Sequence, residues 1–240
     1  SVTLTDTGRA YFERCVPLLE QIDALDDVIQ HRQASLSGTI RLTAPTAFGS
    51  TKLVDALAPF LQLHPNIRVE LSLSDQHVAI IDEGVDVAIR FGQLQDSTLI
   101  AKRLMRMRIV AFASPEYLAR HGKPSHPSAL ATHNCLLQKS QVDPDNWKFK
   151  VDGQLVIVNV QGTFASNSPR AVTQMASQGL GIGMGPKYVT EPYVKDGSLQ
   201  LLFEDYEANE LILNAVYASN RHIPARIRAL LEHLAVAFKQ

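Results

Sequence analysis

The sequence predicts an α/β protein with two Rossmann-like lobes around a central cleft, preceded by one long helix. Three observations lead to this prediction. Strand-like and helix-like segments alternate from residue 39 to residue 91, a second such series begins near residue 114, and the first 37 residues have a helical heptad pattern. A chain of 240 residues that is 45% hydrophobic and 20% charged can bury cores for both lobes.

The opening segment has the spacing of a self-associating helix. Its seam positions alternate in steps of four and three and are apolar except at Arg32; they are Tyr11, Cys15, Leu18, Ile22, Leu25, Ile29, Arg32 and Leu36. Thr5 suits an N-cap, Pro17 predicts a kink or a new helix start, and Gly38 suits a stop. We expect a second copy of the helix to cover this seam, and the alternative is a helix folded back onto its own domain.

The first βα series runs from residue 39 to residue 91. Residues 39–44, 67–73 and 85–91 alternate as strands, and a loop at 45–50 leads into a helix that ends near His64. The inner face of that helix is apolar and consists of Leu53, Leu57, Phe60 and Leu61. Val78, Ile80 and Ile81 predict a short helix closed by Gly84. This order predicts parallel strands with helices on the faces of the sheet.

The second series contains further strands and helices. Residues 104–114, 182–184 and 211–219 are predicted strands, and 147–149 and 154–163 form an antiparallel pair. Asn167, Ser168 and Pro169 are a strong start signal for a helix over 169–177, and 186–195 and 223–238 are further helices. We expect the chain to cross between the lobes near Ala113 and again near Ala218.

Several short motifs resemble those of the LysR-type transcriptional regulators. The residues that carry the resemblance are Leu4-Thr5-Asp6-Thr7-Gly8, Gly38-Thr39-Ile40-Arg41-Leu42, Glu83-Gly84-Val85-Asp86-Val87-Ala88-Ile89-Arg90, Ala113-Ser114-Pro115-Glu116-Tyr117-Leu118 and Gly179-Leu180-Gly181-Ile182. The resemblance covers essentially the whole chain. It implies a type 2 periplasmic-binding-protein-like fold whose regulatory lobes close on a small effector, and it implies homodimers or homotetramers formed through the linker helix.

The resemblance also divides the chain. Residues 1–37 would be the end of a winged helix-turn-helix and the linker helix, 38–113 with 217–240 the first lobe, and 114–216 the second lobe. Promoter DNA would be contacted by DNA-reading helices that precede Ser1. The 23 basic and 24 acidic residues give a formal net charge of -1, so this part lacks the basic excess of a surface that binds DNA unaided.

The effector site is predicted at strand ends and helix starts that face each other across the cleft. The candidates in the first lobe are Pro45, Thr46, Ala47, Phe48, Ser74, Asp75, Arg90, Phe91 and Gly92, and those in the second lobe are Ser166, Asn167, Ser168, Met184 and Pro186. Helix starts carry free N–H groups that favour an anion, often a carboxylate. Plain helix capping is the alternative for either set taken alone.

Charges near the predicted site leave the effector class open. Arg90 can bind a carboxylate beside the apolar Phe91, and the alternative is an ion pair with Asp75 or Asp86. Because Asp75 opposes a simple anion, a zwitterionic, aromatic or neutral effector is equally compatible with these residues.

Other patterns argue against enzymes, metals and cofactors. Gly179, Gly181, Gly183 and Gly185 follow a helix, which favours helix capping and close packing over nucleotide binding. The histidines and the two cysteines lack metal-ligand spacing, and no nucleophile elbow occurs. We expect no cofactor, no membrane partner and a reducing, cytoplasmic location. A solute receptor of a transport system is the alternative function, since it shares the two-lobed architecture.

Overall fold

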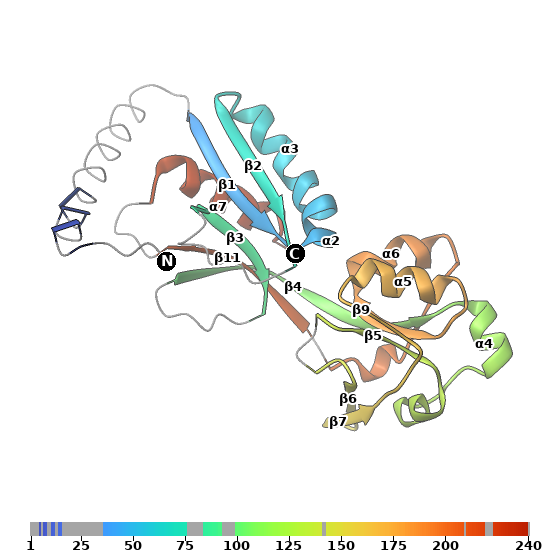
Figure 1. Ribbon diagram of the computed structural model, residues 1–240. Coiled ribbons are helices and arrows are strands. Elements are labelled where there is room, and N and C mark those ends of the chain that lie inside the picture. Colours follow the sequence, from blue (N-terminus) through green and yellow to red (C-terminus); the bar gives the residue numbers. More distant parts are fainter. Residues whose placement is uncertain are drawn as a thin grey trace.

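The computed structural model describes residues 36–75, 84–92, 99–140, 143–208, 210–218 and 223–239, together with residues 5, 7–8, 11–12 and 14–15. These residues form two lobes, and the long strand β4 (Leu99–Ala113) runs from one lobe into the other (Figure 1). The two-lobed α/β architecture expected from the alternation of strands and helices is therefore present.

The first lobe is built on parallel strands, as the sequence predicts. β1 (Gly38–Ala44) lies between β2 (Ile67–Leu73) and β3 (Val87–Phe91) and pairs in parallel with both. The sheet continues with β11 (Glu210–Ala218) and the first part of β4, which are antiparallel to their neighbours. A continuous helical run follows β1, consisting of α2 (Thr46–Phe48), the π-helical turn η1 (Gly49–Leu53) and α3 (Val54–Leu63).

Helices α3 and α7 (Ala225–Ala237) form the core of the first lobe with the sheet. The predicted inner face of this helical run is confirmed, because Leu53, Leu57 and Phe60 are buried and Leu61 packs half-buried against the same core. The imidazole of His233 in α7 bonds the carbonyl of Ala56 in α3 at 2.7 Å, which ties the two helices together. The predicted helix at Val78, Ile80 and Ile81 lies outside the described residues, and Gly84 after it has a positive φ of 63°.

The second lobe continues the same sheet. Its order is β4, β9 (Ile182–Pro186), β5 (Cys135–Gln138) and β8 (Phe164–Ser166), with β10 (Gln200–Leu202) on β4. Helices α5 (Pro169–Ser177) and α6 (Lys187–Lys195) lie on one side of the sheet in Figure 1. The other side carries α4 (Pro115–His121), the 3₁₀ turns η2 (Pro127–Thr132) and η3 (Glu204–Tyr206), and a hairpin of β6 (Asn146–Val151) and β7 (Gln154–Asn159).

The chain passes from one lobe to the other twice, and the strand pairing places both crossings earlier in the sequence than predicted. The predicted boundaries followed residues 113 and 216. In β4 the residues up to Arg108 pair with β11, and those from Ile109 pair with β9. All of β11 pairs within the first lobe, so the chain returns just before Glu210. Because β4 is one continuous strand that runs from one lobe into the other, no turn or break in its sequence marks the change of lobe.

Two glycines of the alternating series have the structural roles expected of them. Gly179 has a φ of 75° and follows α5, where its N–H bonds the carbonyl of Ala176 at 3.0 Å. A Cβ on Gly183 would lie 2.4 Å from the ring of Phe112. The series therefore ends a helix and permits close packing, as predicted.

The described parts of the N-terminal segment are helical. Residues 7–8, 11–12 and 14–15 have helical geometry, and the hydroxyl of Thr5 accepts a hydrogen bond from Gly8 N–H at 3.1 Å, as a helix cap does. Within the described residues, no helix has the length and apolar content that crossing a membrane requires.

Candidate functional site

The helix start of the first lobe is capped by a distant carboxylate. Asp75, just beyond the end of β2, accepts a hydrogen bond from the backbone N–H of Thr46 at 3.0 Å. Pro45 occupies the N-cap position and provides no capping side chain. The hydroxyls of Ser50 and Thr51 bond carbonyls four residues earlier in the run, at 2.7 Å each. This helix start therefore already holds a negative charge at the place where an anion was predicted.

Arg90 lies at the neighbouring strand end with a half-buried side chain. Its guanidinium donates to the hydroxyl of Thr43 at 3.1 Å and to the carbonyl of Ile89 at 2.9 Å. Burial lowers the pKa of Arg90, and the negative charge of Asp75 opposes that shift. Asp86 accepts instead from the backbone N–H of Arg41 at 2.7 Å, so the two carboxylates considered for Arg90 each hold a backbone group.

An aromatic contact joins the two lobes at this edge. Tyr188, in the first turn of α6, lies 5.7 Å from the ring of Phe48 and 6.5 Å from that of Phe91, measured between centroids. Phe48 and Phe91 are themselves 5.6 Å apart in a T-shaped arrangement. Ring pairs of this kind add to the energy of burial, so Tyr188 holds the second lobe against the first.

The charges around Tyr188 also come from both lobes. Burial raises the pKa of the Tyr188 phenol, Asp75 in the first lobe raises it further, and Arg170 in the second lobe lowers it. Lys52 in the first lobe likewise helps to lower the pKa of Glu191 in α6, after the larger effect of Lys195. Asp75 thus acts electrostatically on Arg90 in its own lobe and on Tyr188 in the other lobe, and Arg170 acts on Tyr188 as well.

The helix start of the second lobe is capped locally. The hydroxyl of Ser168 accepts from Ala171 N–H at 3.4 Å, and the hydroxyl of Ser166 accepts from Ser168 N–H at 3.1 Å. Asn167 between them is exposed, as is Arg170 in the first turn of α5. Ser168 therefore caps its helix, as the alternative prediction held. Asn167 and Arg170 provide exposed polar groups beside the start of α5.

A buried polar side chain stands next to this helix start. Gln138 ends β5, where it pairs with Ser166 of β8. Its side chain donates to the hydroxyl of Ser140 at 2.9 Å, but its carbonyl oxygen is buried and has no hydrogen-bond partner among the described residues. An unsatisfied buried acceptor is costly, and such groups concentrate at functional sites.

Not every predicted site residue is accessible. Ala47, Phe48 and Met184 are buried in the cores, and Pro186 is buried where β9 ends. Gly92 has a φ of 95° and is held by the side chain of Asn214, which donates to its carbonyl at 2.7 Å. Tyr188, Arg170 and Gln138 were not among the residues predicted from the sequence. Tyr188 comes right after the end of a strand, Arg170 lies in the first turn of a helix, and Gln138 ends a strand. These positions are the signals that could have identified them.

The predicted dimer seam is described in part. Tyr11 is 74% exposed and Cys15 is partly exposed, so neither is buried against the lobes in this chain. Leu18, Ile22, Leu25 and Ile29 lie outside the described residues. The part of the chain that the structure describes contains no group of three or more His, Cys, Asp or Glu side chains suited to hold a metal.

The comparison with known protein families decides what kind of protein this is. The LysR substrate binding domain matches residues 33–239 of the chain. The chain belongs to the LysR-type transcriptional regulators. The match covers both lobes together with the residues of the interlobe junction.

Curated LysR-type relatives agree with this assignment. An HTH-type transcriptional regulator of Haemophilus influenzae is 30% identical over 226 residues, which are 94% of this chain and 78% of that protein. The HTH-type transcriptional activator AaeR of Escherichia coli is 27% identical over 99% of this chain and 77% of its own length. These relatives are regulators and not enzymes, and they give no support to the transport-receptor alternative.

Solved LysR-type structures have the same fold. AphB of Vibrio cholerae, a virulence activator, is 27% identical with a TM-score of 0.75 and covers 99% of this chain and 81% of its own. CrgA of Neisseria meningitidis is 27% identical with a TM-score of 0.78 and the same coverage of 99% and 81%. The type 2 periplasmic-binding-protein-like architecture implied by the resemblance is thereby confirmed.

Proposed function

We propose that this chain is the effector-binding and oligomerisation part of its LysR-type regulator and that the effector binds at the interlobe junction. LysR-type regulators bind small effectors and DNA and form oligomers. For this chain we place the effector between the helix start of α2 and that of α5, with Thr46, Arg90 and Asn167 as its polar contacts. Binding there would change the relation of the lobes and, through it, the oligomer.

The observation that supports this placement most strongly is the contact of Tyr188 with Phe48 and Phe91. It brings the rim of the second lobe against the strand ends of the first. Ligands of open α/β sheets bind beside such strand ends. A small molecule that competes with or completes this contact can therefore shift the balance between open and closed lobes.

The charges favour an effector that carries an acidic group together with a hydrogen-bond donor. Arg90 and Arg170 supply positive charge from the two lobes, and the start of α5 has no carboxylate as its cap. Asp75 repels an anion at the start of α2 and attracts a donor. A carboxylate with an amino or hydroxyl substituent meets all three conditions.

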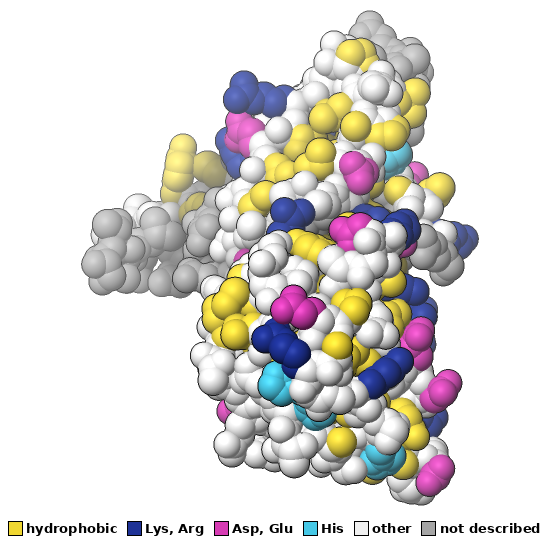
Figure 2. Space-filling view, turned by 90° about the vertical axis from the view of Figure 1, so that its right-hand side faces the viewer, with side chains coloured by type: hydrophobic (Ala, Val, Ile, Leu, Met, Phe, Trp, Pro, Cys, Tyr) yellow, Lys and Arg dark blue, Asp and Glu magenta, His cyan; other side chains and the backbone are white. Residues whose placement is uncertain are grey.

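We further propose that the intact regulator is cytoplasmic, pairs through the seam from Tyr11 to Ile29, and contacts promoter DNA through the winged helix of its family. The chain is poorly suited to contact DNA alone, because its formal net charge is -1, and basic and acidic side chains are interspersed over the face that Figure 2 shows. Deletion of residues 1–37 should lower the oligomeric order in sedimentation velocity, and an unchanged assembly would contradict this role.

A thermal-shift screen of small carboxylates, followed by calorimetry of the compounds that raise Tm, tests the effector site. We expect the ligand that gives the largest shift to lose affinity in Asn167→Ala and Arg90→Gln. The matched control is Lys123→Gln, an exposed residue of the second lobe that follows α4, on the side of the sheet away from α5. Equal affinity for all the variants would contradict the interlobe assignment.

A further inference from the structure

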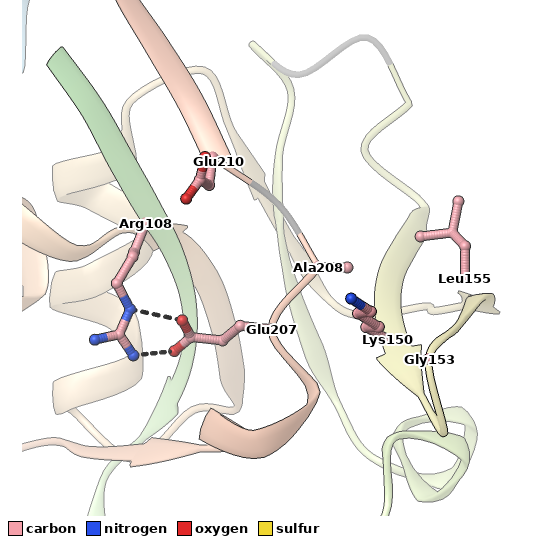
Figure 3. A pocket seen from close by; sticks show the side chains of 7 residues that line it. All are labelled: Arg108, Lys150, Gly153, Leu155, Glu207, Ala208 and Glu210. Carbon is pink, nitrogen blue, oxygen red and sulfur yellow. Dashed lines mark hydrogen bonds and ion pairs between the residues drawn. The ribbon is translucent and has the colours of Figure 1, made fainter.

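A cavity of about 520 Å³ lies where the chain passes between the lobes. Its size falls in the range of small-molecule sites. Figure 3 shows the residues that line it, which are Arg108, Lys150, Gly153, Leu155, Glu207, Ala208 and Glu210. None of them belongs to the interlobe junction described above. We call this space the hinge cavity.

The walls of the hinge cavity come from both connections between the lobes and from a hairpin of the second lobe. Arg108 is the last β4 residue that pairs with β11, and Glu207 and Ala208 belong to the returning segment. Lys150 and Leu155 face each other across the β6–β7 hairpin. A change in the angle between the lobes therefore changes the distance between these walls.

The carboxylates of the cavity already have cationic partners. Glu207 accepts two hydrogen bonds of 2.7 Å from the guanidinium of Arg108, a forked pair that Figure 3 marks with dashed lines. Glu210 pairs with Arg106 at 3.2 Å. An isolated β-bridge between Phe149 and Glu207 also fixes Glu207 to the hairpin. Each of these two carboxylates is thus already paired with an arginine.

Lys150 is the cation of this cavity without such a partner. It makes no ion pair within the described parts of the chain, and in Figure 3 its ammonium lies between the hairpin and the Arg108–Glu207 pair. Its cross-strand neighbour Leu155 is 61% exposed. A charged group and an exposed aliphatic side chain at the edge of one cavity suit a ligand with an anionic head and an apolar body.

We propose that the hinge cavity is a second ligand site, which binds a small amphipathic anion with its acidic group on Lys150 and its aliphatic or aromatic body over Leu155. A ligand that fills the cavity contacts the start of β11 in the first lobe, at Glu210, and the hairpin of the second lobe at once. Its affinity therefore depends on the hinge angle, and by linkage its binding changes that angle. This inference does not rest on the interlobe effector site.

The hairpin offers a matched control for the test. Lys148 and Ile157 form the neighbouring cross-strand pair on the same outward face, since side chains two residues apart point the same way. Ile157 is 57% exposed, close to the 61% of Leu155, but neither Lys148 nor Ile157 lines the cavity. The two pairs therefore separate binding in the cavity from binding anywhere on the hairpin.

The test titrates the complete chain with 8-anilinonaphthalene-1-sulfonate, followed by fluorescence, and then displaces the dye with octanoate. We expect Lys150→Gln and Leu155→Ser each to weaken binding of the dye and of octanoate about tenfold, the typical effect of losing one charged or apolar contact. Lys148→Gln and Ile157→Ser should change either affinity less than twofold.

Three outcomes would overturn the proposal. Equal weakening by both pairs would place the probes on the open face of the hairpin. Loss of binding in Asn167→Ala, with Lys150→Gln unchanged, would place them at the interlobe junction. Absence of saturable binding by either probe would show that the hinge cavity is not a site for an amphipathic anion.

Discussion

The two helix starts at the interlobe junction look alike in sequence but differ in the structure. The start of α2 is capped by Asp75, a carboxylate from beyond the next strand, whereas the start of α5 is capped by the hydroxyl of Ser168 within its own turn. Asp75 therefore places a negative charge at the start of α2. A local neutral cap leaves the second start positive.

This difference separates the roles of the two lobes. The first lobe supplies a rigid wall, since Phe48 is fully buried and α2 is fixed by a contact that spans 29 residues. The second lobe supplies exposed polar groups, Asn167 and Arg170, at the start of α5. We therefore expect substitutions of the buried first-lobe residues to act mainly through stability, and those of the exposed second-lobe residues mainly through ligand binding.

The largest effect should come from removing the aromatic core below the first helix start. Phe48→Ala deletes a ring that contacts Phe91, Tyr188 and Phe238, and should lower the free energy of unfolding by about 3–5 kcal/mol. Urea denaturation measures the change. Asn167→Ala at the other start should stay within about 0.5 kcal/mol of the parent. Similar losses in the two variants would remove the distinction between the lobes.

Effector affinity gives the next largest expected effect. Thr46→Val and Asn167→Ala should each weaken binding by about 1.5–3 kcal/mol, tenfold or more, because each loses one hydrogen bond to a charged group. Neither change should alter the unfolding midpoint appreciably, since both side chains are exposed. Calorimetry with the ligand found in the screen provides the measurement, and unchanged affinity in both variants would count against the junction as the site.

The caps themselves can be compared directly. Asp75→Ala frees the Thr46 N–H and removes a charge from the helix start, with an expected cost of about 1–2 kcal/mol. Ser168→Ala removes a longer hydrogen bond of 3.4 Å and should cost about 0.5–1 kcal/mol. Asp75→Asn, which keeps an acceptor without the charge, serves as the control. A reversed order of the two costs would contradict the stronger role of Asp75.

The smallest effect concerns pH and the second lobe. Burial, and after it the charge of His121, lowers the pKa of His133, whose ring nitrogen lies 3.1 Å from the Tyr117 hydroxyl. Below a pH of about 6.5, the ordinary pKa of histidine, His133 is therefore protonated more in the unfolded chain than in the folded one. The free energy of unfolding should accordingly decrease as the pH falls from about 6.5 toward the lower pKa of the folded state. His133→Gln should flatten this decline in chemical denaturation between pH 8 and pH 5. An undiminished decline would show that other groups cause it.

Most of the secondary structure was predictable because it depends on local patterns. The predicted helix over 169–177 coincides with α5, since Ser168 and Pro169 define its start chemically. The short strands β5, β8 and β10 were missed, because three or four residues are too few to show alternation. Local pattern also failed to show that β4 serves both lobes.

The candidate site was predictable only in part. Thr46, Arg90 and Asn167 follow from strand ends and helix starts, which the sequence marks. The capping of α2 by Asp75 and the contact of Tyr188 with Phe91 depend on which segments meet in three dimensions. No spacing rule along one chain contains that information, so these interactions became visible only with the fold.

The central claim, that an acidic effector is held at the interlobe junction by groups from both lobes, is tested most directly by one calorimetric series. It titrates the strongest carboxylate from the screen into the parent chain, Arg90→Gln, Arg170→Gln and the hinge variant Lys150→Gln. We predict that both arginine variants lose affinity about tenfold and that Lys150→Gln binds as the parent does. Parent-like affinity in both arginine variants would contradict the account.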